Sequence, residues 1–106
     1  MNLHQDVIIA ADRIHPYIRK THLTNSRPFS NLVNADVWFK LESLQITGSF
    51  KARGAVNKLL SLTNQEREQG VVSASTGNHG AAVAYAAGEL DIDCTIYVPD
   101  DASPAK

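Results

Sequence analysis

Lys51 lies in a segment, residues 48–55 (GSFKARGA), whose residue types and spacing could support nucleophilic chemistry. Ser49 is a suitable helix N-cap, so Lys51 is expected in the first turn of the helix that follows. The helix dipole disfavours positive charge there, and a desolvated amine in that place can titrate below a free lysine and act as a nucleophile. The helix start also offers N–H groups to a phosphate, and Phe50 offers its face to a planar ring. Gly54, which is unfavourable inside a helix, predicts a close approach by another backbone. The alternative interpretation is a surface lysine with no chemical role.

Residues 75–80 (STGNHG) form the second candidate segment, a tight loop between a predicted strand and a predicted helix. Backbone N–H groups at such a junction point outward and bind anions, so a carboxylate would suit this loop. The amide of Asn78 could hydrogen-bond a phenolic oxygen. The alternative is a capping loop, in which Ser75 or Asn78 satisfies the N–H groups of the helix.

The spacing of hydrophobic residues predicts the elements that position these segments. Helices are expected at 3–14 (ended by Pro16), shortly after Pro28, from the Lys51 region to residue 62, and at 79–90; strands are expected at 37–41, 71–74 and 94–98, and a further helix could open at 101–104. Strand 71–74 is expected to be buried. This alternation predicts an α/β fold with a mainly parallel sheet and flanking helices. Such sheets bind ligands outside the carboxyl ends of their strands, where the loops 42–50 and 75–78 both fall.

The composition argues against several functional classes. A formal net charge of −1, with scattered Lys and Arg, provides no electrostatic footprint for nucleic acid or an anionic membrane. No apolar run has the length needed to cross a bilayer, and no secretory signal is visible. Cys94 is the one cysteine, which fits a reducing cytoplasm, and His4, His15 and His22 lack metal-ligand spacing. We therefore expect a cytoplasmic protein with no metal, no nucleic-acid partner and no membrane partner.

Taken together, the two segments resemble a known family. Residues 40–55 (KLESLQITGSFKARGA) resemble the lysine segment of fold-type II pyridoxal-phosphate enzymes, and residues 75–80 resemble the asparagine loop of the same family. Residues 19–23 (RKTHL) resemble its arginine-threonine-proline-leucine segment, with His22 in place of the usual proline. The nearest resemblance is to the threonine/serine dehydratase and serine racemase branch, and the loop is also similar to that of hydroxyectoine-utilisation dehydratases.

The resemblance implies roles for individual residues. Lys51 would form the Schiff base with pyridoxal 5'-phosphate and later move the Cα proton of an amino-acid substrate. Phe50 would lie against the pyridine ring, and Asn78 would hydrogen-bond the 3-hydroxyl oxygen of the cofactor. The substrate carboxylate would be held by Ser75, by Thr76 and by the backbone around Gly77, Asn78 and His79.

Thr76 departs from the family pattern. Dehydratases of this family usually have alanine at this position and serine racemases have serine, whose hydroxyl can act on the face of Cα opposite the lysine. Thr76 keeps the hydroxyl and adds a methyl group. The function implied is an ammonia-lyase that converts serine, threonine or a similar hydroxy-amino acid to a 2-keto acid and ammonia. The alternatives are an amino-acid racemase on the same site and a non-catalytic truncated fragment.

The resemblance also implies a domain organisation. Residues 1–70 would be the N-terminal part of the large cofactor-binding domain, and residues 71–106 would begin the small domain. The family's glycine-rich phosphate loop and its partner for the pyridine nitrogen are not found in the sequence, and both normally follow much later in a family member. We therefore expect an incomplete part of a two-domain enzyme, inactive by itself and homo-oligomeric as the complete enzyme.

Overall fold

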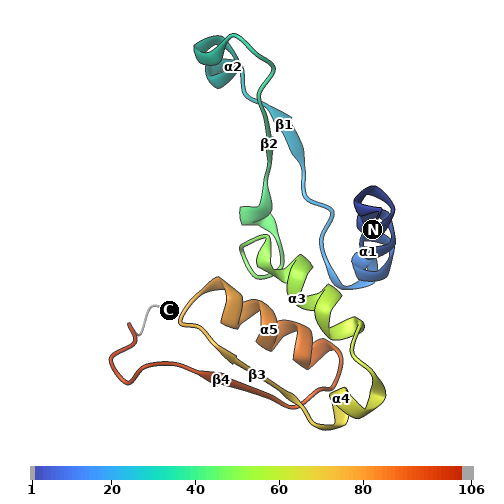
Figure 1. Ribbon diagram of the computed structural model, residues 1–106. Helices are drawn as coiled ribbons and strands as arrows, with labels where there is room; N and C mark the ends of the chain where they lie inside the picture. Colours follow the sequence, from blue (N-terminus) through green and yellow to red (C-terminus); the bar gives the residue numbers. More distant parts are fainter. Residues whose placement is uncertain (1, 104–106) are drawn as a thin grey trace.

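The computed structural model describes residues 2–103 of the 106-residue chain. The helices are α1 (Leu3–Ile14), α2 (Arg27–Val33), α3 (Lys51–Leu60), α4 (Asn64–Glu68) and α5 (Asn78–Glu89). The strands are β1 (Leu23–Asn25), β2 (Trp38–Lys40), β3 (Val71–Ala74) and β4 (Cys94–Tyr97). Two short 3-10 helices are η1 (His15–Tyr17) and η2 (Glu42–Leu44). Figure 1 shows two parts: a packed unit of α3, α5, β3 and β4, and a long ribbon of β1 and β2 that carries α2 at its tip.

The packed unit is built on a parallel strand pair covered by helices. Val71 of β3 lies opposite Cys94 of β4, and Ala74 lies opposite Tyr97. The core lies between α3 and α5 and is closed by the end of α1. Its buried members are small or branched apolar side chains: Ile14, Ala55, Val56, Leu59, Ala82, Val83, Ala86, Ala87 and Ile92. Four alanines in this set allow the two helices to approach closely. The predicted α/β fold with a parallel sheet and flanking helices is therefore confirmed.

The strand predicted at 37–41 does not belong to the parallel sheet, so the expected place of this segment in the fold was wrong. It forms β2, which pairs antiparallel with β1 in a separate sheet of two strands. In this ribbon Leu23 lies opposite Lys40 and Asn25 opposite Trp38. Strand β1 was not predicted, because three residues with exposed side chains show no hydrophobic alternation. The loop 42–50 therefore follows a ribbon strand and not a strand of the parallel sheet.

Other local differences have simple causes. Strand β3 is not buried as expected: its side chains alternate between half-buried and exposed, because helices cover one face of the pair and Val72 points away from them. Helix α4 was not predicted, although Thr63 and Glu66 form a reciprocal capping box at its start. Near the C-terminus, the Ala102 N–H donates to the Pro99 carbonyl at 3.0 Å in a turn, and residues 101–103 form no helix; the last residue of the expected helix start, 104, lies outside the described residues.

Candidate active site

Lys51 is the first residue of α3, so the predicted position in the first helical turn is confirmed. Gly48, with φ of +70°, turns the chain into the helix, and the Ser49 hydroxyl accepts the Lys51 N–H at 3.3 Å. The helix N-cap by backbone geometry is Phe50, one residue later than expected. The Lys51 side chain is exposed, and its Nζ atom lies 5.2 Å from the centre of the Phe50 ring. The expected backbone contact at Gly54 is absent among residues 2–103, since a Cβ atom there would meet none of their atoms within 4 Å.

The loop of residues 75–77 joins β3 to α5, as predicted. The Ser75 N–H donates to the Tyr97 carbonyl at 3.1 Å, which extends the strand pairing into the loop. The Ser75 hydroxyl accepts the Gly77 N–H at 3.2 Å, and no side chain caps the N-terminus of α5. Gly80 packs against the loop so closely that a Cβ atom would lie 2.8 Å from the Ser75 carbonyl oxygen. The helix therefore begins with N–H groups that no side chain of the described residues satisfies, which is the arrangement that favours an anion.

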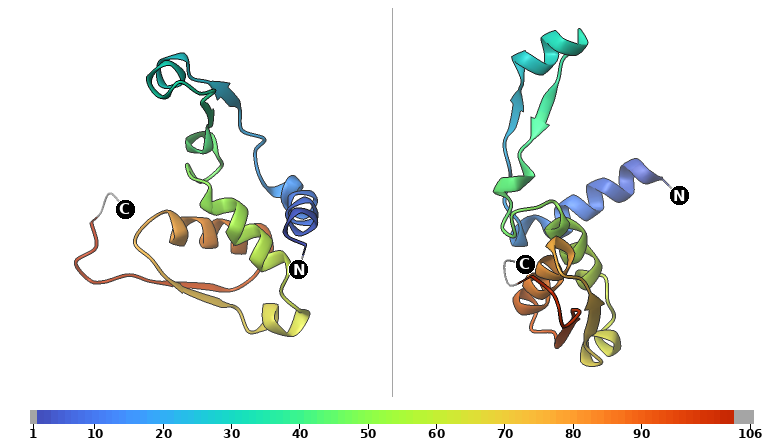
Figure 2. Two further views of the ribbon diagram at one scale, coloured as in Figure 1. Left: turned by 45° about the horizontal axis from the view of Figure 1, so that its top comes forward. Right: turned by 90° about the vertical axis from the view of Figure 1, so that its left-hand side faces the viewer.

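Helices α3 and α5 bring the two segments to the same end of the packed unit. They pack side by side with their N-terminal ends together, in the views of both Figure 1 and Figure 2. Phe50, Lys51 and His79 line one hollow of about 440 Å³. Ser75, Thr76 and Gly77 line a second hollow of about 350 Å³ on the other side of α5.

The candidate residues therefore fall into two groups on either side of α5. Val83 lines the first hollow, whereas Ala81 and Ala84 line the second. Asn78 is exposed at the first position of α5, between the groups, and lines neither hollow. Across residues 2–103, no cluster of three or more histidine, cysteine, aspartate or glutamate side chains could hold a metal ion.

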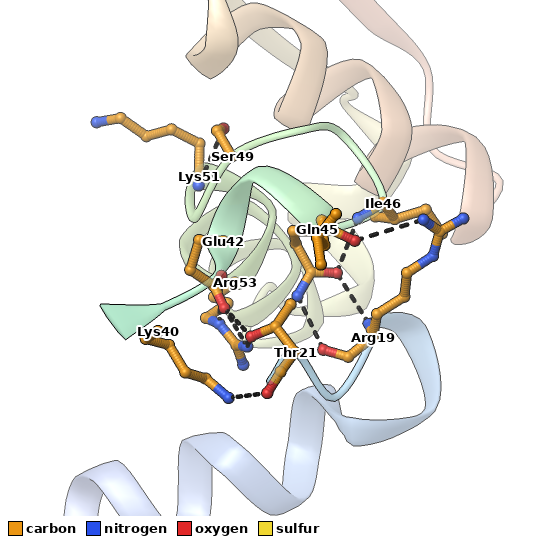
Figure 3. Close-up of polar contacts among 10 residues, drawn as sticks. Arg19, Thr21, Lys40, Glu42, Gln45, Ile46, Ser49, Lys51 and Arg53 are labelled. Atoms are coloured by element: carbon orange, nitrogen blue, oxygen red, sulfur yellow. Dashed lines mark hydrogen bonds and ion pairs between the residues drawn. The ribbon is translucent and has the colours of Figure 1, made fainter. Parts of the chain in front are cut away.

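A polar cluster behind Lys51 was not assigned any role by sequence reasoning. Arg53, two residues after the lysine, donates to both carboxylate oxygens of Glu42, from Nε at 2.8 Å and from a terminal nitrogen at 2.7 Å. The Thr21 hydroxyl donates to the same carboxylate at 2.5 Å, and the Lys40 amine donates to the Thr21 carbonyl at 2.6 Å. In Figure 3 these side chains converge on one side of the start of α3, while the Lys51 side chain extends away from them.

The charge of Glu42 is stabilised by this cluster. The two hydrogen bonds from Arg53 lower the pKa of the Glu42 carboxyl from 4.5 to about 2, and the Thr21 hydroxyl adds to the effect against the opposing cost of burial. The same contact raises the pKa of Arg53 above its ordinary value. Both groups are therefore charged at neutral pH, and the forked geometry of the pair fixes their relative orientation.

Gln45 ties the segment before the ribbon to the loop before Lys51. Its side chain is 2% exposed, accepts the Arg19 N–H at 2.8 Å and donates to the Arg19 carbonyl at 2.9 Å. It also accepts the Ile46 N–H at 2.9 Å. Because the contacts with Arg19 join residues 26 positions apart in sequence, no local periodicity could have predicted them. The segment 40–53 is consequently held by buried and half-buried polar groups, whereas the Lys51 amine has no hydrogen-bond acceptor among the residues that the structure describes.

Fold and site together define an α/β unit that presents a lysine amine and an aromatic ring beside an uncapped helix N-terminus. Residues 14–106 match the family described as "Pyridoxal-phosphate dependent enzyme", and the chain belongs to this family. Among residues 2–103, no helix is both long and apolar enough to span a membrane.

The relatives differ in the reactions that their names give. The chain is 45% identical over 102 residues to L-threonine dehydratase catabolic TdcB of Staphylococcus aureus (strain USA300), covering 95% of this chain and 30% of that protein. The crystal structure of serine racemase from Dictyostelium discoideum superposes with a TM-score of 0.89 at 42% identity, covering 95% of this chain and 33% of that one. The crystal structure of a threonine deaminase from T.th. gives a TM-score of 0.76 at 43% identity, covering 91% of this chain and 33% of that one. The chain thus spans about a third of the length of the relatives it matches.

Proposed function

We propose that this chain supplies the cofactor-binding lysine and the carboxylate-binding loop of a pyridoxal-phosphate-dependent ammonia-lyase acting on serine, threonine or a similar hydroxy-amino acid. The observation that carries the proposal is the pairing of α3 and α5, which places the starts of both helices at one end of the packed unit. One helix begins with the Lys51 amine, and the other begins with N–H groups that no side chain in the described part of the chain caps.

The donor set of the two segments suits pyridoxal phosphate. An exposed primary amine without a competing acceptor among the described residues is available to the cofactor aldehyde, and the neighbouring Phe50 ring is available to a planar heterocycle. The Asn78 amide, exposed at the start of α5, is a suitable hydrogen-bond donor to a phenolic oxygen. When bound, pyridoxal phosphate supplies the electron sink that makes the Cα proton of an amino acid acidic.

The protein residues would then orient the substrate and move one proton. The Lys51 amine would hold the cofactor covalently until the substrate amine replaces it, and would afterwards accept the Cα proton. The N–H groups at the start of α5, with Ser75, Thr76, Gly77 and His79, would hold the substrate carboxylate. Departure of the β-hydroxyl and hydrolysis of the product give a 2-keto acid and ammonia.

Racemisation on the same site is the second candidate, and Thr76 is the residue that favours it. Its side chain is half-buried and lines the hollow shared with Ser75 and Gly77, on the other side of α5 from the hollow that Lys51 lines. A hydroxyl there could exchange a proton with the Cα face opposite the lysine. The relatives include both a threonine dehydratase and a serine racemase, so both reactions are consistent with the comparisons.

The proposal is tested by cofactor titration of the full gene product. We expect pyridoxal phosphate to produce the visible absorbance of a lysine-bound cofactor and the protein to form keto acid from serine or threonine. Lys51→Ala should abolish both. The matched control is Lys58→Ala, two helical turns further along α3 and lining the same hollow, which should retain both. Loss of the absorbance in Lys58→Ala but not in Lys51→Ala would overturn the proposal.

Three further expectations stay predictions: the domain division at residue 70, a homo-oligomeric complete enzyme and a cytoplasmic location. For the first, α3 and α5 share one core across residue 70, so a boundary there would separate domains that remain in close contact.

A further inference from the structure

The start of α3 is weakly held by its own residues. The N-cap residue Phe50 makes no side-chain capping hydrogen bond, and the Ser49 hydroxyl accepts one long hydrogen bond of 3.3 Å from the Lys51 N–H. Gly48, just before the helix, has a left-handed backbone conformation, and glycine restrains the backbone less than any other residue. The strongest contact in the first turn is the forked ion pair of Arg53 with Glu42, whose side chains are 32% and 16% exposed.

The ion pair and the Lys51 amine lie on different faces of the helix. Residues two apart on an α-helix are rotated by roughly 200° about its axis, and in Figure 3 the Lys51 side chain leaves the helix away from Arg53 and Glu42. The pair can therefore act on the amine only through the helix backbone. The Thr21 hydroxyl donates to Glu42, and the Lys40 amine donates to the Thr21 carbonyl. These hydrogen bonds connect the ion pair to the base of the ribbon.

We propose that the Glu42–Arg53 ion pair, braced by Thr21, is a positioning device that sets the direction of the Lys51 amine. This inference rests on the function proposed above, because it assigns the pair to the lysine of that site. Loss of the two hydrogen bonds between Arg53 and Glu42 lets the first turn of α3 rotate or fray, while the later turns stay packed on α5. The amine then reaches the Cα proton less often in the productive geometry, although the substrate carboxylate is still bound at the start of α5.

The effect should appear in kcat and not in KM. A displacement of a reacting group by about 1 Å can cost on the order of a hundredfold in rate. We expect Arg53→Met in the full gene product to lower kcat about tenfold or more, with KM changed less than about threefold. Glu42→Gln should act in the same direction. Arg53→Lys, which keeps the positive charge but cannot donate two parallel hydrogen bonds to Glu42, should keep only part of the parent kcat.

Two readouts report position and not overall stability. Hydrogen exchange of the cofactor-free protein over residues 48–55 measures the ordering of the first turn, and the visible circular dichroism of the bound cofactor measures how rigidly it is held. The matched control is Arg13→Met, which removes the hydrogen bond of 3.0 Å from Arg13 to Asn57 further along α3. All variants are compared at a temperature at which they remain folded, and if Arg53→Met does not fold, Arg53→Lys and Glu42→Gln are judged by the same readouts.

We expect faster exchange over residues 48–55 and weaker dichroism per bound cofactor in the Arg53 and Glu42 variants, with both unchanged in Arg13→Met. Unchanged exchange and dichroism in the Arg53 and Glu42 variants, even with a lowered melting temperature, would overturn the inference. A parent protein that takes up no cofactor would refute the proposed function instead, and the exchange measurement would still decide whether the pair orders the first turn.

Discussion

Acidification should weaken the protein through Glu42, by an amount that follows from its pKa. One pKa unit corresponds to about 1.4 kcal/mol, so a carboxyl whose pKa falls from 4.5 to about 2 on folding contributes up to about 3 kcal/mol. Because the folded pKa is the lower one, this stabilisation is fully present above about pH 4.5 and is lost as the pH falls through about 2. At pH 3, about 1 kcal/mol should remain.

The assay compares urea unfolding of the cofactor-free full gene product with that of Glu42→Gln at pH 7 and at pH 3. The difference in unfolding free energy between parent and variant should shrink by about 2 kcal/mol at the lower pH. Glu68→Gln is the matched control, because it removes an exposed carboxyl of α4 that has no ion pair among the described residues. A parent-to-variant difference that is the same at both pH values would refute the assigned role of the ion pair.

Three further predictions concern the loop, the reaction and the isolated chain. Gly80→Ala should lower the free energy of unfolding by about 1 kcal/mol or more, because its Cβ would meet the Ser75 carbonyl oxygen at 2.8 Å. Gly54→Ala should raise the free energy of unfolding by up to about 1 kcal/mol, because its Cβ would meet no atom of the described residues within 4 Å. Urea unfolding measures both variants, and equal effects would contradict the close contact between Gly80 and the loop. Thr76→Ala should suppress slow serine racemisation more than keto-acid formation, measured by chiral chromatography, and equal loss of both would show that Thr76 only positions substrate. The 106-residue chain by itself should self-associate, because large apolar side chains of the ribbon and α1 are exposed. It should form no keto acid, because the family's phosphate loop and its partner for the pyridine nitrogen are not found in the sequence. Light scattering and a keto-acid assay check this, and a monomer with turnover would contradict it.

The sequence predicted most closely the bounds of those helices whose side chains meet a core. Helices α1, α3 and α5 have hydrophobic residues at helical spacing, and their observed bounds agree with the prediction closely. In the ribbon the same logic found β2, within the predicted strand 37–41, but missed β1 and the pairing of the two strands. Both strands have three residues with exposed side chains, and each pairs with residues 13 to 17 positions away in the chain. Helix α4 could have been found, since the Thr63 and Glu66 spacing is a local capping signal.

The candidate site was predictable only in its chemistry. Lys51 and the 75–77 loop were identifiable because a helix start and a strand-to-helix junction are local features. The contacts that hold Lys51 in place were not, because Thr21, Glu42 and Arg53 are separated by 21, 11 and 32 positions in their pairwise contacts. A set of polar residues this far apart carries no periodic signal, so the positioning of the lysine emerges only from the folded chain.

The central claim is that Lys51 is the residue that binds pyridoxal phosphate. The most direct test is borohydride reduction of the full gene product after incubation with the cofactor, followed by digestion and mass-spectrometric peptide mapping. The pyridoxyl group should be found on Lys51, at the start of α3. A pyridoxyl group found instead on Lys40, at the end of β2, or on Lys58, further along α3, would contradict the assignment.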